Sequence, residues 1–247
     1  ITEGVVIQRK FKGKTYTSKS TFETLDAIVQ SGDEYDKAVA ARLKESLQED
    51  IPLFELDPKH HAKNAYGVYD SSHFITLNKG SADNQTTLHE VAHAITVHKI
   101  RFGLQNSSTE HGRIVKDIKK CHEIAKAEAK KRGLKSKYYG LKNLYEFVAS
   151  AYGNHEQFRE FLSSIKVAED GNLFTRFLKK IRDILGFPPE ESNLFLKTLY
   201  HSGNLMEQRL EVRGRGKTRR FLEPDAAESD RGFITPGERP SRTAQVE

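Results

Sequence analysis

Cysteine is almost absent from this sequence, because Cys121 is the only one among 247 residues. No intramolecular disulfide can therefore form, and a cysteine-rich zinc site is excluded. Long hydrophobic runs are also missing: none approaches the roughly 20 apolar residues that span a bilayer, so we expect no membrane span. The first residues, ITEGVVIQRKFKGKTY, lack an initiator methionine and the pattern of a signal peptide. We expect a piece cut from a longer polypeptide, in an intracellular compartment.

The charge balance is mildly basic. Lysine and arginine number 40 against 34 acidic residues, which gives a formal net charge of +6. This balance permits binding to nucleic acid but does not demand it. Many lysines gather in residues 116–137, KDIKKCHEIAKAEAKKRGLKSK, where aspartate and glutamate are mixed among them. That mixture favours a solvated helix face over a nucleic-acid-binding patch.

Two N-terminal segments predict helices. Residues 20–30 open with Ser20 and carry Glu23 three positions later, which is the spelling of a capping box. Residues 33–50 repeat apolar side chains at a helical spacing of four. These side chains are Tyr35, Val39, Leu43 and Leu47.

A β-hairpin is expected at residues 65–77. Two runs rich in β-forming residues flank Asp70-Ser71-Ser72, which suits a turn. In the second run His73, Ile75 and Leu77 alternate with Phe74 and Thr76. We expect these strands to form a short antiparallel sheet.

The second half of the chain predicts a series of helices separated by glycine or proline. A long charged helix is expected from about 113 to 132, because Gly133 can end it. Two shorter helices are expected on either side of Gly153-Asn154, and two more around Pro188-Pro189. From about residue 212 aliphatic side chains become rare, and glycine, proline, arginine and glutamate dominate, which indicates a disordered tail or linker.

One short motif carries recognisable chemistry. Residues 86–99 read TTLHEVAHAITVHK and contain H-E-x-x-H at His89, Glu90 and His93. Histidines four residues apart lie on one face of a helix, so both imidazoles can reach one ion, and zinc accepts such nitrogens. Glu90 would lean over a remaining coordination position and act as general base. Ser81 or Asp83 can cap the helix.

The motif alone is only suggestive, since a catalytic zinc takes three protein ligands and a water. His98 does not suit as the third ligand, because five residues beyond His93 it points about 140° away at 100° per residue. The longer pattern H-E-x-x-H-x-x-G-x-x-H is also excluded, because Thr96 and Lys99 stand where it needs glycine and histidine.

A second helix offers a better ligand. In residues 138–152, YYGLKNLYEFVASAY, an apolar stripe runs along one face, and Glu146 stands beside it. A carboxylate at the edge of an apolar face is costly unless it is paired, hydrogen-bonded or bound to metal. With two histidines upstream that need an anionic ligand, the pattern favours Glu146 as that ligand. Two neutral imidazoles and one carboxylate would leave a zinc centre with a net charge of +1, which still acidifies its water.

HEVAH followed by YGLKNLYEFVA resembles the lethal-factor-like gluzincins and the zincin-type peptidase domain of phage and mobile-element polyvalent proteins. The resemblance covers about residues 66–165. It implies that His89, His93 and Glu146 are zinc ligands and that Glu90 is the general base. It also implies that the Tyr139 hydroxyl stabilises the oxyanion of the tetrahedral intermediate, where negative charge develops.

The resemblance has one departure and one further implication. Relatives often carry an acid four residues after the ligand glutamate, whereas this chain has Ser150, which predicts weaker support for a ligand histidine and a lower metal affinity, by about ten-fold or more. Zincins commonly lay an extended substrate along an edge strand. Residues 73–78, HFITLN, are the candidate edge strand, and a core strand is the alternative for the same residues.

We therefore expect an α+β, mostly helical fold of the zincin-like type, with a short antiparallel sheet and an H-E-x-x-H helix. The predicted regions are an N-terminal helical region at 1–64, a catalytic domain with C-terminal helices at 65–211, and a basic, polar tail at 212–247. The predicted function is Zn²⁺-dependent hydrolysis of protein or peptide substrates. The substrate would be a host protein, a virion protein or the parent polypeptide, and the location the host cytoplasm or the virion.

Two other functions remain as alternatives. One is an inactive zincin scaffold that serves protein interaction, against which the intact Glu90 and Tyr139 argue. The other is a nucleic-acid-associated module, suggested by the lysine-rich helix and by RGRGKTRR at residues 213–220. Binding of that kind would weaken with salt, because phosphate contacts release counterions.

Overall fold

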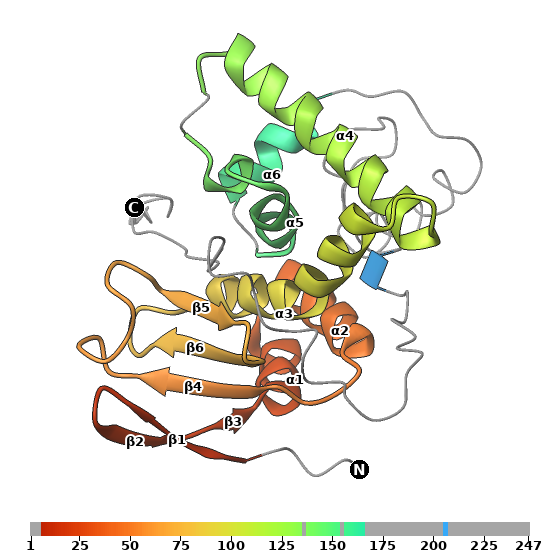
Figure 1. The fold of residues 1–247 in the computed structure, drawn as a ribbon. Helices are drawn as coiled ribbons and strands as arrows, with labels where there is room; N and C mark the ends of the chain where they lie inside the picture. The colour runs from red at the N-terminus through yellow and green to blue at the C-terminus, as the bar shows by residue number, and fades with distance from the viewer. Residues whose placement is uncertain (1–5, 135–136, 154–155, 166–204, 207–247) are drawn as a thin grey trace, which may run out of the picture.

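A computed structural model describes residues 6–134, 137–153, 156–165 and 205–206 (Figure 1). Within these residues the fold is α+β, with six α-helices, one 3₁₀ helix and two small sheets. The predicted helices around Pro188-Pro189 and the predicted tail from 212 lie outside the described residues. Among the helices that are described, none is both long and apolar enough to cross a membrane.

The main sheet has four strands in the order β3-β4-β6-β5, formed by Lys19–Ser20, Pro52–Leu56, Phe74–Asn78 and Gly67–Asp70. The predicted short antiparallel sheet is confirmed in part: β3–β4 and β5–β6 pair antiparallel, whereas β4 pairs with β6 in parallel. The sequence analysis predicts no strand at residues 52–56. A parallel partner comes from a distant part of the chain, so no turn signal beside β4 announces it.

The predicted hairpin is confirmed as β5 and β6. Their register pairs Gly67 with Leu77 and Asp70 with Phe74. The turn closes through a bond from the backbone N–H of His73 to the carbonyl oxygen of Asp70, and His73 has a positive φ of 64°. The predicted edge strand is wrong, because β6 lies inside the sheet and β5 forms its edge. Four of the five β6 residues are buried, since both faces of the strand are covered.

A second hairpin, β1 (Gln8–Phe11) and β2 (Lys14–Thr17), precedes the main sheet. Its two-residue turn has positive φ at both Lys12 and Gly13, which is the preferred geometry for a hairpin of this length. Phe11 packs edge-on against Phe54 of β4 and Phe74 of β6. These rings form a small hydrophobic cluster that joins the hairpin to the sheet.

The two predicted N-terminal helices are present as α1 (Thr21–Ser31) and α2 (Glu34–Ser46). Ser20 caps α1 by accepting a bond from the backbone N–H of Glu23, as predicted. Asp33 caps α2 in the same way. The α2 helix stops at Ser46, so it is shorter than the predicted 33–50.

The α3 helix (Asn84–Gln105) lies between the sheet and α5 and also packs against α2 and α4 (Figure 1). Asp83 caps α3, which settles the choice between Ser81 and Asp83. After α3 come α4 (Glu110–Lys131), η1 (Tyr139–Leu141), α5 (Leu144–Tyr152) and α6 (Glu156–Ser163). Gly133, with a φ of +70°, follows the last turn of α4, as the sequence predicts.

One hydrophobic cluster joins the described parts of the chain on both sides of residue 64. It contains Leu25, Leu43 and Leu53 together with residues of α3, α4, α5 and α6. The Tyr35 hydroxyl adds a buried hydrogen bond of 2.7 Å to the carbonyl oxygen of Ala151. Residues 6–64 therefore share a core with the later helices, and they supply β1–β4 as well as the predicted helices.

Candidate metal centre

The α3 helix presents His89 and His93 on one face, four residues apart, in the position that H-E-x-x-H predicts. Their neighbours Leu88, Val91 and Ala92 are fully buried and fix the helix in the core. The two histidine side chains are buried as well, at 0% and 2% exposed. Polar side chains this deep need partners.

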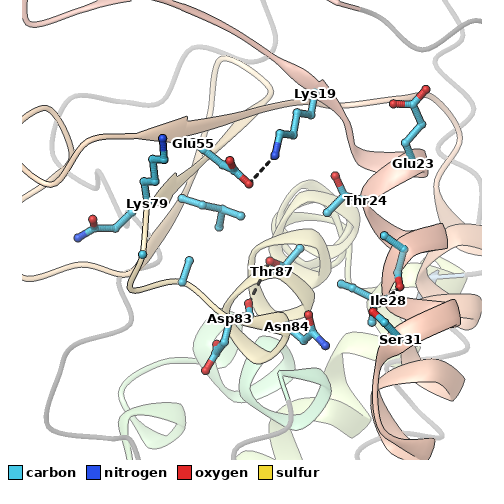
Figure 2. A pocket seen from close by; sticks show the side chains of 15 residues that line it. Lys19, Glu23, Thr24, Ile28, Ser31, Glu55, Lys79, Asp83, Asn84 and Thr87 are labelled. Carbon is cyan, nitrogen blue, oxygen red and sulfur yellow. Dashed lines mark hydrogen bonds and ion pairs between the residues drawn. The ribbon is translucent and has the colours of Figure 1, made fainter.

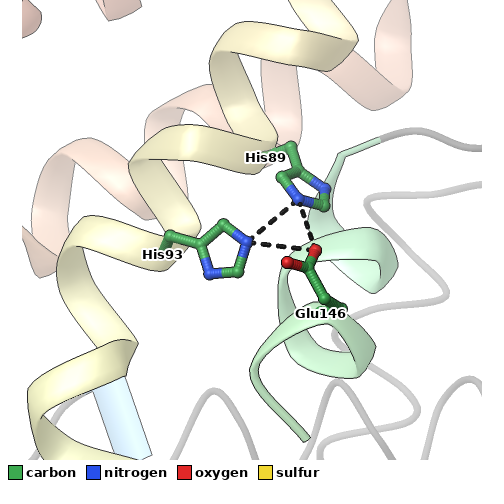
Figure 3. Close-up of side chains that lie close together, drawn as sticks. All are labelled: His89, His93 and Glu146. Atoms are coloured by element: carbon green, nitrogen blue, oxygen red, sulfur yellow. Dashed lines mark hydrogen bonds and ion pairs between the residues drawn. The ribbon is translucent and has the colours of Figure 1, made fainter. Parts of the chain in front are cut away.

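Glu146 comes from α5 and meets both histidines (Figure 3). The side chain of Asn143 caps α5 by accepting a bond from the backbone N–H of Glu146, at 2.8 Å. This cap places the carboxylate in the first turn, where it is only 1% exposed. Its Oε2 lies 3.1 Å from Nε2 of His89 and 3.3 Å from Nε2 of His93.

His89, His93 and Glu146 form a buried group that could hold a metal ion. The two imidazole Nε2 atoms are 3.0 Å apart. Ligands that sit 2.0–2.1 Å from a tetrahedral zinc are about 3.3 Å from one another. The separations of the three atoms are close to that value, so little movement is needed to surround an ion.

The ionisation of this group suits a cation. Burial lowers the pKa of His89 to about 4, so its imidazole is neutral at pH 7 and keeps a lone pair. Burial alone would raise the pKa of Glu146. The facing His93 and the hydrogen bonds to both imidazoles outweigh burial and hold that pKa at about 2. Glu146 is therefore an anion with a neutral imidazole beside it.

Glu90 is fully buried beside the group and is held by the edge of the sheet. Its Oε2 accepts a bond of 2.6 Å from the backbone N–H of Tyr69 on β5. Its Oε1 has no hydrogen-bond partner in the part of the chain that the structure describes. Burial raises the pKa of Glu90 to about 8, and the nearby carboxylate of Glu146 adds to the rise.

Tyr139, the predicted oxyanion donor, lies next to Glu146. It sits in η1, and its hydroxyl donates to Oε1 of Glu146 across 3.3 Å. The ring is partly exposed, whereas Glu146 is buried. Tyr139 is therefore open to solvent in part while it contacts the buried carboxylate.

His98 stays outside the metal group, as its position on the helix predicts. Its Nε2 is 3.2 Å from the Tyr69 hydroxyl, which is also 3.1 Å from Nδ1 of His73.

Ser150, which stands where relatives carry an acid, is 1% exposed, and its hydroxyl has no hydrogen-bond partner within the described ranges. It supplies no carboxylate to support a ligand histidine.

Sequence reasoning missed Tyr69, Gly67 and Gly153, which all touch the site. Tyr69 acts through its backbone, and the two glycines act through the space that they leave. No local pattern marks such roles, because they depend on how β5 and α5 pack on α3.

Replacing Gly153 with alanine is expected to lower the affinity for Zn²⁺ by roughly 10- to 100-fold, the range seen when support of a ligand is lost. A Cβ at this position would lie 2.8 Å from Cβ of His89 and 3.2 Å from its Nδ1. His89 or the end of α5 must therefore shift. Competition with a chromophoric chelator measures the affinity.

Gly133→Ala is the control for that substitution. Gly133 has a φ of +70° and no atom within 4 Å of an added Cβ, so alanine strains the end of α4 without touching His89. An unchanged affinity in Gly153→Ala would contradict the close approach at His89.

A pocket lies away from this group, between α1, the sheet and the start of α3 (Figure 2). It encloses about 460 Å³, and the salt bridge between Lys19 and Glu55 crosses its lining. It shares no lining residue with the metal group. Its walls mix both signs of charge, so they select no class of ligand.

Comparison with family models, curated proteins and solved structures finds no match to this chain.

Proposed function

We propose that this chain is a zinc-dependent peptidase. One observation carries the proposal: three buried ligand atoms converge at the spacing of a tetrahedral site, next to a buried carboxylate with an unpartnered oxygen, Oε1 of Glu90, among the described residues. A purely structural cluster would gain nothing from leaving a buried acid half satisfied, since such a group costs about 1–3 kcal/mol.

His89, His93 and Glu146 would hold the ion. Two imidazoles and one carboxylate suit zinc, and three protein ligands leave a fourth position for water. A zinc ion held there would supply Lewis acidity to that water and to the carbonyl oxygen of the substrate. The neutral His89 and the anionic Glu146 are already in the ionisation states that ligation requires.

Glu90 would act as the general base. Its Oε1 takes the proton of the attacking water and later delivers it to the leaving amine. A pKa raised to about 8 would leave it mostly protonated at pH 7, but a cation beside it would lower that pKa again. Its Oε2 stays bonded to the backbone N–H of Tyr69.

Tyr139 would stabilise the transition state. Its hydroxyl donates to Glu146, and the residue is partly exposed. It could turn from that carboxylate oxygen to the oxyanion that develops on the carbonyl of the substrate. A donor aimed at the developing charge stabilises the transition state more than the ground state.

The substrate would be a protein or peptide, and the chain would be one module of a longer phage or mobile-element polypeptide. An inactive scaffold is the alternative within the same fold. The alternative hypothesis of a nucleic-acid-associated module has less support, because several basic residues of α4 are already paired with acids. Acids on α4 pair with nearby basic residues, in Glu110–Arg113 and Asp117–Lys120 within the helix and in Glu128–Arg132 at its C-cap.

Removal and return of zinc test the proposal. The purified chain is expected to carry about one zinc per molecule by elemental analysis and to cleave members of a fluorescence-quenched peptide library. A chelator should abolish cleavage, and added Zn²⁺ should restore it. One zinc per chain without cleavage of any peptide would favour the scaffold. No zinc after reconstitution would overturn the metal site itself.

A further inference from the structure

We infer that Tyr69 and Gly67 of the edge strand β5 are positioning residues for Glu90: the backbone N–H of Tyr69 fixes one carboxylate oxygen, and the missing side chain of Gly67 makes room for the rest. This inference rests on the proposed function for its catalytic meaning. The contact itself is a property of the fold and can be tested without turnover.

The register of the hairpin explains why this N–H is available. The carbonyl oxygen of Tyr66 accepts from the backbone N–H of Asn78, so Tyr66 faces β6. Backbone groups of successive residues in an antiparallel pair alternate in direction. Gly67 and Tyr69 therefore turn their N–H groups away from β6, toward the outer edge of the sheet. The backbone N–H of Tyr69 donates to Glu90 and takes no part in the hydrogen bonds between β5 and β6.

Gly67 lets α3 approach the strand closely. A Cβ on Gly67 would lie 2.7 Å from Cγ of Glu90 and 2.8 Å from the methyl carbon of Thr86. Both distances are shorter than side-chain carbons tolerate, so any larger residue would push Glu90 or the strand aside. Gly67 has no positive φ, and we attribute the need for glycine to this contact.

The side chain of Tyr69 makes a second contact between β5 and α3. Its ring is 5% exposed, and its hydroxyl lies 3.2 Å from Nε2 of His98, two turns along α3 from Glu90. His73, whose Nε2 is 3.2 Å from a carboxylate oxygen of Glu49, holds the same hydroxyl from the turn. The backbone of Tyr69 is thus fixed between two contacts to α3.

This arrangement divides the two oxygens of Glu90 between two tasks. With Oε2 anchored to a rigid strand, the carboxylate has one orientation, and Oε1 is left to move the proton. A base that could rotate would lose part of the advantage of a fixed geometry, where a displacement of about 1 Å can cost roughly 100-fold in rate.

The first test compares Tyr69→Pro with Tyr69→Ala. Both remove the ring, but proline alone also removes the N–H, and an edge position whose N–H does not join the ladder tolerates proline. We expect kcat for the proline variant to lie about 10- to 100-fold below that of the alanine variant. Zinc content and KM should agree within about two-fold. Equal kcat values in the two variants would overturn the inference.

The second test needs no activity and covers a proline variant that does not fold. Exchange of the Tyr69 amide hydrogen is measured by NMR in the metal-free chain and in Glu90→Ala. We expect about ten-fold or more faster exchange at Tyr69 in the variant, with little change at Val68 and Asp70, whose N–H groups face β6. Unchanged exchange at Tyr69 would overturn the inference that its backbone N–H holds Glu90. A wild-type chain whose Tyr69 amide is protected by Glu90 but which cleaves nothing would instead count against the proposed function.

Discussion

Glu90→Gln is expected to retain about one zinc per chain and to lose peptide hydrolysis by roughly 10²- to 10⁴-fold in kcat, the usual contribution of a general base. Glutamine has the size of glutamate, and its amide oxygen can still accept from the backbone N–H of Tyr69. It cannot take a proton from water. Steady-state kinetics and elemental analysis on the same preparation measure the two quantities.

The same variant has a signature in stability that does not depend on turnover. In the metal-free chain the pKa of Glu90 is raised by burial to about 8, from an ordinary value of 4.5. The folded state therefore binds this proton more tightly, and the contribution of Glu90 to the stability of the wild type falls as pH rises from about 4.5 to 8. Glutamine does not titrate, so metal-free Glu90→Gln should lack this component of the fall. Equal pH dependence in both chains would show that Glu90 is not buried as described.

Glu146→Ala is expected to remove zinc binding, with a loss of affinity well beyond the roughly 10- to 100-fold that loss of an outer partner costs. Alanine leaves two imidazoles and no anion, so the site loses both a ligand and the charge that offsets the ion. Isothermal titration of the metal-free protein with Zn²⁺ measures the affinity. Glu123→Ala is the control, because Glu123 is an exposed glutamate on α4, away from the metal group.

Thermal unfolding gives the same answer by a separate route. A ligand present at 1,000 times its Kd stabilises the folded state by about 4 kcal/mol. In a chain of this size that corresponds to a rise in Tm of roughly 8–16 °C. Wild type and Glu123→Ala should show this rise with zinc, and Glu146→Ala should not. A rise in Glu146→Ala equal to that of the wild type would remove this glutamate from the ligand set.

The metal group could be predicted from the sequence because each of its members leaves a local trace. His89 and His93 are spaced for one helix face. Glu146 stands beside an apolar stripe, and the structure brings the three together as predicted. The caps at Ser20 and Asp83 and the glycine after α4 follow equally local rules.

The sheet was harder to predict because its pairing is not local. The β4 and β6 strands pair in parallel although β5 lies between them in the sequence, and no short-range pattern specifies a parallel neighbour. The β1–β2 turn did carry a signal, since Lys12-Gly13 suits a two-residue hairpin loop. The contact of Glu90 with Tyr69 follows only once the edge of the sheet is known.

The placement of α4 has a consequence for how the chain holds together. His89 and His93 are 57 and 53 residues from Glu146 along the sequence, and α4 fills much of that interval. An ion bound to both sides would act as a crosslink in a chain whose one cysteine allows no disulfide. Closing a flexible loop costs only about 0.6 kcal/mol more for each doubling of its length. The segment between α3 and α5, which contains α4, could therefore lengthen or shorten at little thermodynamic cost, provided that His89, His93 and Glu146 still reach the same ion.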